Sequence, residues 1–250
     1  MIGRSRRIAE VLGLLAVLVA LPAVAETPAI GKVEVLEGTA TRTPEGGQPV
    51  ALGVGATVHL QDTVDAKGPL KIALNDGSVI MLDGGSQLVF DEAAFGDQAA
   101  RERFSARLSF GRFWAKVKKA VAGSDAKFEV KTDRAVAGVR GTIFRIDATK
   151  FAGSTRVPKK AKTQVWVTTG KVAVASTKAL KEKKAKAQGP RVQVAGPQEI
   201  SKEAWEKRFA ELQAGMSVTV TDELWTVAPE PEPKDRFAAF IRRHDDLKED

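Results

Sequence analysis

Cysteine and tyrosine are absent from this 250-residue chain, and histidine occurs only twice. Without cysteine the chain has no disulfide framework, no thiolate ligand for a metal and no thiol nucleophile. The two histidines, His59 and His244, lie in distant parts of the sequence and form no cluster of the kind that holds zinc. We therefore predict no metal and no other cofactor.

Motifs that carry catalysis are also missing. The chain has no G-x-S-x-G nucleophile elbow, and its glycine-rich segments lack the Lys-Ser/Thr ending of a phosphate-binding loop. Asp62, Asp76 and Asp83 have the setting of turn residues. The acidic pair Asp245 and Asp246 lies in a charged tail that offers no desolvated pocket. We predict that the protein is not an enzyme, with a hydrolase as the most distant alternative.

Long apolar runs are missing too, apart from one near the N-terminus. Arginines at positions 4, 6 and 7 precede an apolar run over residues 11–21 and the tripeptide Ala23-Val24-Ala25. This order of a basic region, a short apolar run and an A-x-A site predicts a secretory signal peptide over residues 1–25. The run is shorter than the ~20 apolar residues of a spanning helix, so we favour cleavage over an uncleaved N-terminal membrane anchor. The protein is expected in the periplasm or outside the cell.

Positive charge is in excess, with 39 Lys and Arg against 31 Asp and Glu and a formal net charge of +8. Such a surface favours anionic partners, for example envelope lipids or glycans. The densest run, residues 178–186, includes Lys181, Lys183, Lys184 and Lys186. We expect a solvated loop or helix turn there, with a dedicated anion-binding patch as the alternative. The aromatic and basic stretch 107–121 fits a strand with core aromatics better than a nucleic-acid site, so no nucleic-acid partner is predicted.

From residue 30 onward, short segments of alternating apolar and polar residues are separated by turn residues. Strands are expected at 32–36, 40–43, 50–55, 58–60, 70–74, 79–81, 88–90, 163–169 and 171–175, the last two as a hairpin closing at Gly170. Many short strands with regular turns predict an all-β sandwich, barrel or solenoid. Residues 91–107 break the pattern, and we expect a helical or loop excursion over the sheet there.

The centre of the chain is the stretch 127–146, KFEVKTDRAVAGVRGTIFRI. Phe128 and Val130 alternate with charged residues, and an apolar extended run resumes after Gly141. A glycine-rich middle, residues 135–142, joins the two segments and contains Arg140 as its one charged side chain. Arg140 is expected to hold adjacent turns together through backbone carbonyls or a carboxylate, and contact with an anionic partner is the alternative.

This block resembles the signature of the FecR domain, a periplasmic all-β module. Its elements correspond to residues 128–130, 132–135, 138–144 and 170–174, and upstream elements to 52–55, 62–64 and 70–82. Asp65 and Ala66 depart from the family pattern, which has a threonine after D-x-V. The resemblance covers about residues 30–176 and implies a short, twisted β-solenoid-like or sandwich module. The motif positions that it implies as structural or interaction residues are Gly138, Val139, Arg140, Gly141, Thr142 and Phe144.

The resemblance also implies a function. Members of the family that regulate sigma factors carry a cytoplasmic anti-sigma segment and a membrane span before this domain, whereas here we expect a signal peptide. It therefore implies an envelope-sensing or protein-interaction module with an envelope protein as partner, rather than direct control of a sigma factor across a membrane. A cell-surface binder of polyanions or glycans is the alternative.

The C-terminal part predicts two helices. Ser201 is expected to cap a helix over 201–212 whose apolar stripe, Trp205, Phe209 and Leu212, docks on the β module. Asp235 is expected to cap an amphipathic helix after a stiff Pro-Glu linker. The apolar face of this helix, Phe237, Phe240 and Ile241, either folds back on the β core or binds a partner. We thus divide the chain into a signal peptide (1–25), a FecR-like domain (26–176), a basic loop with helix and late strands (177–228) and a linker with the terminal helix (229–250).

Overall fold

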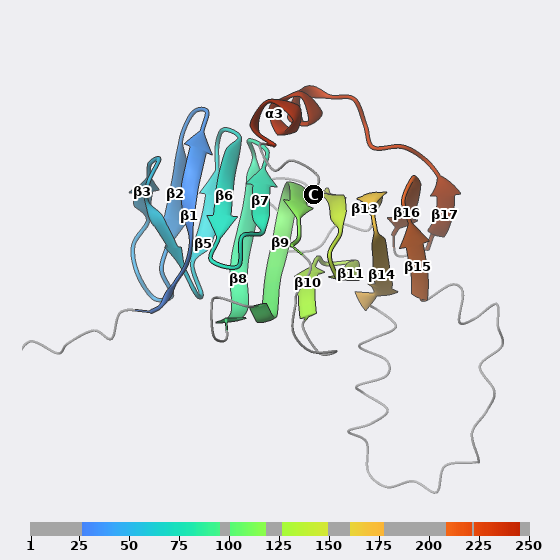
Figure 1. The fold of residues 1–250 in the computed structure, drawn as a ribbon, viewed down its shortest axis with the longest axis horizontal. Helices are drawn as coiled ribbons and strands as arrows, with labels where there is room; N and C mark the ends of the chain where they lie inside the picture. The colour runs from blue at the N-terminus through green and yellow to red at the C-terminus, as the bar shows by residue number, and fades with distance from the viewer. Residues whose placement is uncertain are drawn as a thin grey trace, which may run out of the picture.

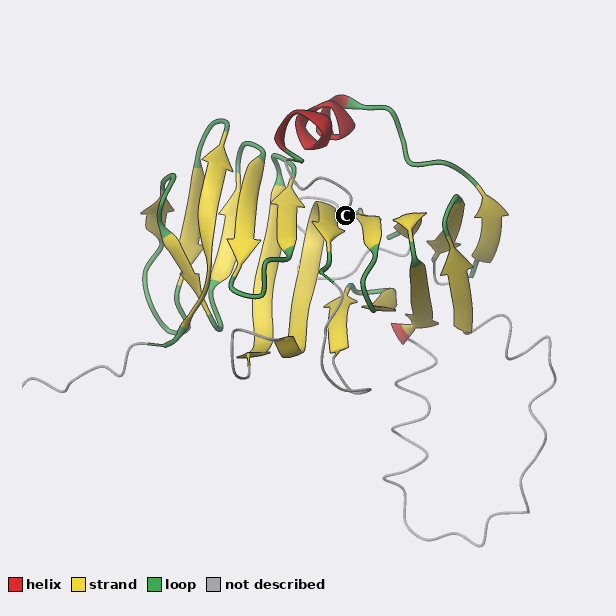
Figure 2. Ribbon diagram, viewed as in Figure 1, coloured by secondary structure: helices red, strands yellow, loops and turns green. Residues whose placement is uncertain are grey.

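The computed structural model describes residues 27–95, 101–118, 127–149, 161–177, 209–221 and 223–245. Strands dominate these residues, and a nine-residue helix, α3 (Arg236–His244), follows the last strand (Figures 1 and 2). The predicted signal peptide and the lysine run at 178–186 lie outside the described residues. The predicted all-β class with a C-terminal helix is confirmed.

The strands form two ladders, here named layers A and B. Layer A runs in the order β4 (Thr57–His59), β1 (Ala29–Leu36), β6 (Leu70–Leu74), β7 (Val79–Leu82), the C-terminal part of β9 (Arg101–Lys116), β12 (Ile143–Ala148), β13 (Thr163–Thr169), β16 (Met216–Val220) and β17 (Trp225–Pro229). Layer B runs in the order β3 (Val50–Leu52), β2 (Ala40–Thr43), β5 (Thr63–Ala66), β8 (Ser86–Phe95), the N-terminal part of β9, β10 (Lys127–Lys131), β11 (Ala135–Val139), β14 (Lys171–Ser176) and β15 (Phe209–Gln213). Neighbours are antiparallel except β9 and β10, which are parallel.

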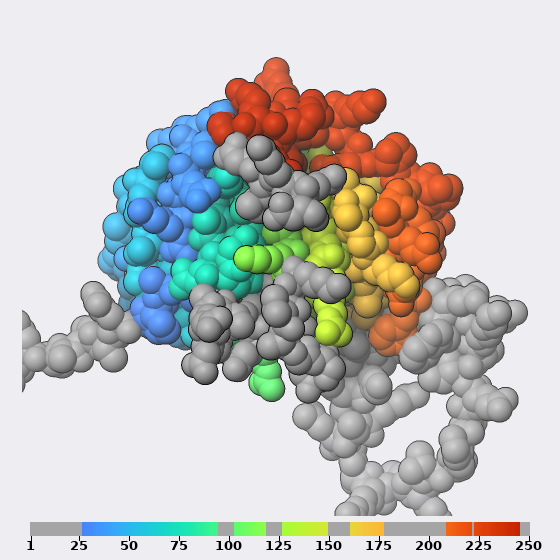
Figure 3. Space-filling view, in the orientation of Figure 1, coloured from blue at the N-terminus to red at the C-terminus, as the bar shows by residue number. Residues whose placement is uncertain are grey.

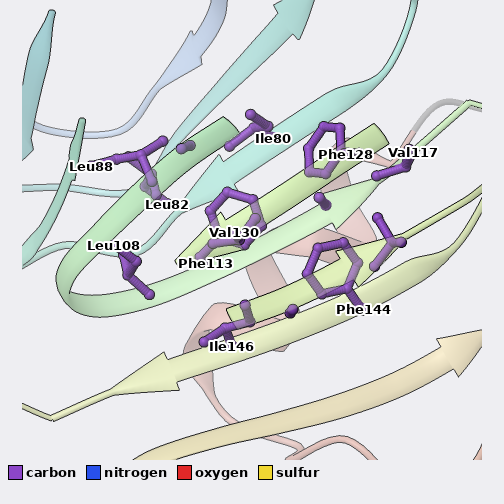
Figure 4. Close-up of a cluster of buried hydrophobic side chains, with 14 of the residues drawn as sticks. Ile80, Leu82, Leu88, Leu108, Phe113, Val117, Phe128, Val130, Phe144 and Ile146 are labelled. Carbon is purple, nitrogen blue, oxygen red and sulfur yellow. The ribbon is translucent and has the colours of Figure 1, made fainter. Parts of the chain in front are cut away.

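The two layers pack face to face around one apolar core. Alternation along each strand supplies the core residues, as in β10, where Phe128 and Val130 are fully buried between charged neighbours. The ring of Phe128 in layer B lies 6.4 Å from that of Phe144 in layer A, measured between centroids. Figure 4 shows these rings together with side chains from β7, β8 and β9. The module is a two-layer sheet that stays open at both ends rather than closing into a barrel.

The layers are joined by β9, which belongs to both. Its residues up to Phe110 pair with β8 and β10, and those from Gly111 onward pair with β7 and β12. Gly111 has a backbone φ of 101°, a value that favours glycine, and it lies against Ser86 at the start of β8. The chain therefore changes layer at a glycine.

Residues 91–95 and 101–107 do not form the helical or loop excursion that we expected, and residues 96–100 lie outside the described residues. Most of this stretch continues β8 and begins β9, and the two strands pair with three register shifts. Phe104, Ala106 and Leu108 are buried on the core side, while Arg107 reaches Asp91 on the exposed side at 2.6 Å. The charged residues that broke the pattern in sequence thus form cross-strand pairs on the outer face.

The predicted hairpin at Gly170 is also wrong. β13 pairs with β12 and β16 in layer A, whereas β14 pairs with β11 and β15 in layer B. Gly170, with φ of 83°, therefore turns the chain from one layer to the other. The glycine-rich middle of the central stretch differs as well, because residues 135–139 form a strand of their own, β11.

Residues 209–212 were expected to end a helix that begins at Ser201. They form β15, which pairs with β14 along its whole length. Leu212 is fully buried in the core, and a turn at Gly215 leads into β16. Edge pairing with β14 outweighs the local helical spacing of the apolar residues. The first part of the expected helix, residues 201–208, lies outside the described residues.

Candidate functional site

The family-motif residues build the connection between β11 and β12. Val139, Thr142 and Phe144 are buried, and the Thr142 hydroxyl donates a hydrogen bond to the Lys171 carbonyl at 3.0 Å. Gly141 has a φ of 65°, a backbone conformation that side chains rarely adopt. These positions hold the turn between two core strands.

Arg140 is the exposed member of the motif. Among residues 138–144 it alone is classed as exposed, while Gly138 beside it pairs with β10 and β14. A shallow groove of about 320 Å³ is lined by Arg140 together with Glu129, Lys171 and Glu211. Lys171 and Glu211 form an ion pair of 2.8 Å across this groove. The motif therefore places one exposed arginine in a surface of mixed charge.

The C-terminal helix α3 folds back on the outer face of layer A. Phe237, Phe240 and Ile241 are 0%, 1% and 7% exposed, and they pack against Val79, Met81 and Trp114. This is the fold-back alternative for the helix. In this conformation the three side chains offer no surface to a partner, because β7 and β9 already cover them.

Arg145 anchors α3 and was not singled out from the sequence. It lies in a cross-strand row on the outer face of layer A, between Trp114 of β9 and Trp166 of β13. Its side chain is 0% exposed, and its guanidinium carbon lies 5.6 Å from the Trp166 ring centroid and 5.3 Å from that of Phe237. The cation is thus enclosed by aromatic rings from the sheet and from α3.

Two aspartates bind the Arg145 guanidinium in a forked arrangement. Asp147 Oδ1 and Oδ2 accept hydrogen bonds from Nε at 2.7 Å and Nη2 at 2.9 Å. Asp235 Oδ1 and Oδ2 accept from Nη1 at 3.1 Å and Nη2 at 2.7 Å. Asp235 is also the N-cap of α3 and accepts the Ala238 N–H at 2.9 Å. One carboxylate therefore starts the helix and fastens it to the sheet.

The linker before α3 is held by two glutamates. Glu230 accepts hydrogen bonds from Gln164 Nε2 at 2.9 Å and Ser217 Oγ at 2.8 Å, and Glu232 accepts from Thr168 Oγ1 at 2.9 Å. The carboxylate of Glu232 also lies 3.9 Å from Arg145 Nη1. The segment from β17 to α3 is thus a strap with polar contacts along its length.

Arg145 and the acidic side chains around it shift one another's pKa values. Burial alone would lower the pKa of Arg145, but its hydrogen bonds to Asp147 and Asp235 outweigh burial and raise it. Burial would raise the pKa of Asp235, yet hydrogen bonds from Arg145 and the Ala238 N–H hold it below its usual value. Burial raises the pKa of Glu232, partly opposed by the hydrogen bond from Thr168.

Acid is therefore expected to release α3, and only at low pH. Because the pKa of folded Asp235 lies below its unfolded value, its stabilisation is complete above the ordinary aspartate pKa of about 3.9 and is lost as the pH falls through the lower folded value. Glu232 has the opposite sign, so its protonation at higher pH does not weaken the fold. The protection of the α3 amides, taken as the ratio of the intrinsic to the observed exchange rate at each pH, should stay constant down to about pH 4 and fall below it. Release between pH 5 and 7, or an unchanged profile in Asp235→Asn, would contradict this.

The described residues show no group of three or more His, Asp or Glu side chains placed to hold a metal ion. In the same ranges, no helical segment has the length and apolar character needed to cross a bilayer. Lys181, Lys183, Lys184 and Lys186 lie outside them, so the anion-binding patch stays a prediction.

Comparison with known proteins gives one family and a distant structural likeness. The model of the family described as "FecR protein" matches residues 63–173. No curated protein matches the chain. Two crystal structures of a proposed anti-sigma factor from Parabacteroides distasonis ATCC 8503 are similar at 15% identity, with TM-scores of 0.44 and 0.42. The matches cover 72% and 71% of this chain and 63% and 62% of those chains, so this chain spans less than two thirds of their length.

Proposed function

We propose that this chain, whose residues 63–173 match the model of the FecR protein family, is a non-enzymatic protein-interaction module that serves sensing or signalling in the cell envelope. The observation that carries the proposal is the family match together with the way its motif is built. Within residues 138–144, buried or half-buried positions form the turn, and Arg140 is left exposed beside a groove. The partner is proposed to be an envelope protein, reached after export by the signal peptide.

Asp62 and Asp76 are carboxylates that could be suspected of catalysis, but both bind groups of the fold itself. This supports the non-enzymatic part of the proposal. Asp62 is 1% exposed and accepts the His59 backbone N–H at 2.8 Å and Arg42 Nη1 at 3.1 Å. Asp76 accepts the backbone N–H of Ser78 at 2.9 Å in the turn before β7. Both carboxylates thus stabilise turns.

A crosslinking experiment tests the proposal. A photo-reactive amino acid at Lys171, which shares the groove with Arg140, should capture one defined envelope protein in intact cells. The same group at Val54, 67% exposed in the turn between β3 and β4, is the matched control and should not. Arg140→Ala should abolish the capture while leaving the melting temperature unchanged, since a structural role for Arg140 would lower it.

A second function, binding of an anionic glycan or lipid surface, is favoured by one observation. Arg236, Arg242 and Arg243 line a groove of about 830 Å³ beside α3, and Arg236 and Arg242 have no ion-pair partner among the described residues. Capture of glycan or lipid alone from a photo-reactive group at Ala239, which lines this arginine groove, would replace the first proposal with this one. If no molecule is captured from Lys171, the proposal of an interaction module is rejected.

A further inference from the structure

The two ends of the sandwich differ in their edge strands. At one end, β3 and β4 have three residues each, and their core-facing residues Leu52 and Val58 are 5% and 0% exposed. At the other end layer A finishes with β17, which lies toward the right of Figures 1 and 3. This strand has five residues and no charged side chain. Within the described part of the chain, β17 pairs with β16 and with no other strand. Short edges are protected against further pairing, whereas β17 is not shortened in this way.

The register shows which backbone groups of β17 face outward. The Thr221 N–H bonds the Leu224 carbonyl at 2.9 Å, and the Glu230 N–H bonds the Gly215 carbonyl at 3.1 Å. In an antiparallel pair, bonded and non-bonded positions alternate, so Thr226 and Ala228 also bond to β16. The N–H and C=O groups of Trp225 and Val227 therefore point away from the sheet.

The core-side face of β17 itself is partly exposed. On β16, Val218 and Val220 are 0% and 1% exposed, but Val227, which lies opposite Val218, is 39% exposed. Trp225 packs against the rim of the core, and its indole N–H has no hydrogen-bond partner among the described residues. Leu224 on the other face is 52% exposed. Apolar surface and unpaired backbone groups thus occur together.

We propose that β17 accepts an extended segment of a partner protein as an additional strand of layer A. This deepens the proposed function, on which it rests, by naming a second place, besides the Arg140 groove, where the protein partner binds. The partner segment has apolar residues facing Trp225 and Val227. It has basic residues at its ends, because Glu223 and Glu230 flank β17 and residues 223–230 contain no lysine or arginine.

A second copy of this chain fits the edge less well. Two-fold pairing of β17 with itself through Trp225 and Val227 brings Glu223 of one copy close to Glu230 of the other. Both copies also carry the same net charge of +8. Like charges at such positions oppose pairing, which favours a different protein with a basic-flanked strand.

The test uses the full chain and a labelled synthetic peptide of alternating valine and threonine with lysine at each end. We expect binding by fluorescence anisotropy and slower hydrogen exchange at the amides of Trp225 and Val227. Val227→Pro removes an N–H that points outward, so the ladder to β16 is kept while the peptide loses its partner. Val227→Lys adds a charge that repels the peptide. Both should weaken binding by about tenfold or more. Val50→Lys, at a similarly exposed valine of the opposite edge, should not.

Four results would overturn the inference. The peptide binds the Val227→Pro chain as tightly as the wild type, or a peptide N-methylated on alternate residues binds as well as the parent. Alternatively, the amides of Trp225 and Val227 exchange slowly in the free chain, which means that the edge is already covered by this chain or by a second copy. The crosslinking experiment can be repeated with Val227→Lys in the chain that carries the photo-reactive amino acid at Lys171. If this chain still captures the envelope protein, β17 is rejected as the partner site while the proposed function stands.

Discussion

Arg145→Ala is expected to detach α3 from layer A and to lower the free energy of unfolding by about 3–5 kcal/mol. The substitution leaves Asp147 and Asp235 facing each other at the place where the guanidinium held both. It also removes the cation enclosed between Trp166 and Phe237. Without the cation the two carboxylates, 23% and 30% exposed at their side chains, repel each other, and α3 detaches because this separates them and returns them to water.

Urea denaturation and amide exchange of α3 measure this effect. Arg243→Ala is the matched control, since Arg243 lies on α3, pairs with Glu37 at 3.3 Å and is 61% exposed at its side chain. An exposed pair of this kind is worth about 0–1 kcal/mol. Arg145→Met combined with Asp235→Asn should recover part of the loss, because fewer charges stay uncompensated. Protected α3 amides in Arg145→Ala would show that Phe237, Phe240 and Ile241 hold the helix without the arginine.

Arg145 and its two aspartate partners show why part of the site could not be predicted from the sequence. On β12, Arg145 and Asp147 alternate with the core residues Phe144 and Ile146, which is the pattern of an ordinary solvated face. They are covered by α3, a segment about ninety positions later in the chain. A signal of this cover did exist. Residues 79–82 are apolar without alternation, as expected for a strand that is buried on both faces.

Local pattern was enough where each strand carries its own alternation or cap. Phe128 and Val130 marked β10, and Asp235 marked the start of α3 with its buried face. It failed where pairing comes from distant strands, as in β15, whose apolar spacing fits a helix as well as a strand. The assignment of strands to two layers also followed from pairing that no single segment encodes, which is why β13 and β14 were expected to form a hairpin.

Gly111→Ala is expected to destabilise the whole module, because the chain changes layers at this residue. A β-carbon there would overlap Ser86 Oγ and Ser86 Cα, and the backbone φ of 101° is unfavourable for alanine. Ser86 has little freedom to move away, since its hydroxyl accepts the Arg112 N–H at 2.9 Å. Backbone strain and overpacking each cost about 1–3 kcal/mol. The sum is a large part of the 5–15 kcal/mol typical of a folded protein.

Gly85→Ala separates the strain from the clash. Gly85 has a φ of 80°, but a β-carbon there meets no atom within 4 Å, so only the conformational cost of about 1–2 kcal/mol is expected. In thermal unfolding, the melting temperature of Gly111→Ala should therefore be well below that of Gly85→Ala. Adding Ser86→Gly to Gly111→Ala should restore part of the difference, because it removes Oγ and Cβ but leaves Cα in contact. If the two single variants melt together, β8 does not press on β9 at Gly111, and the crossing between layers depends on the pairing of β9 with β7 and β12 instead.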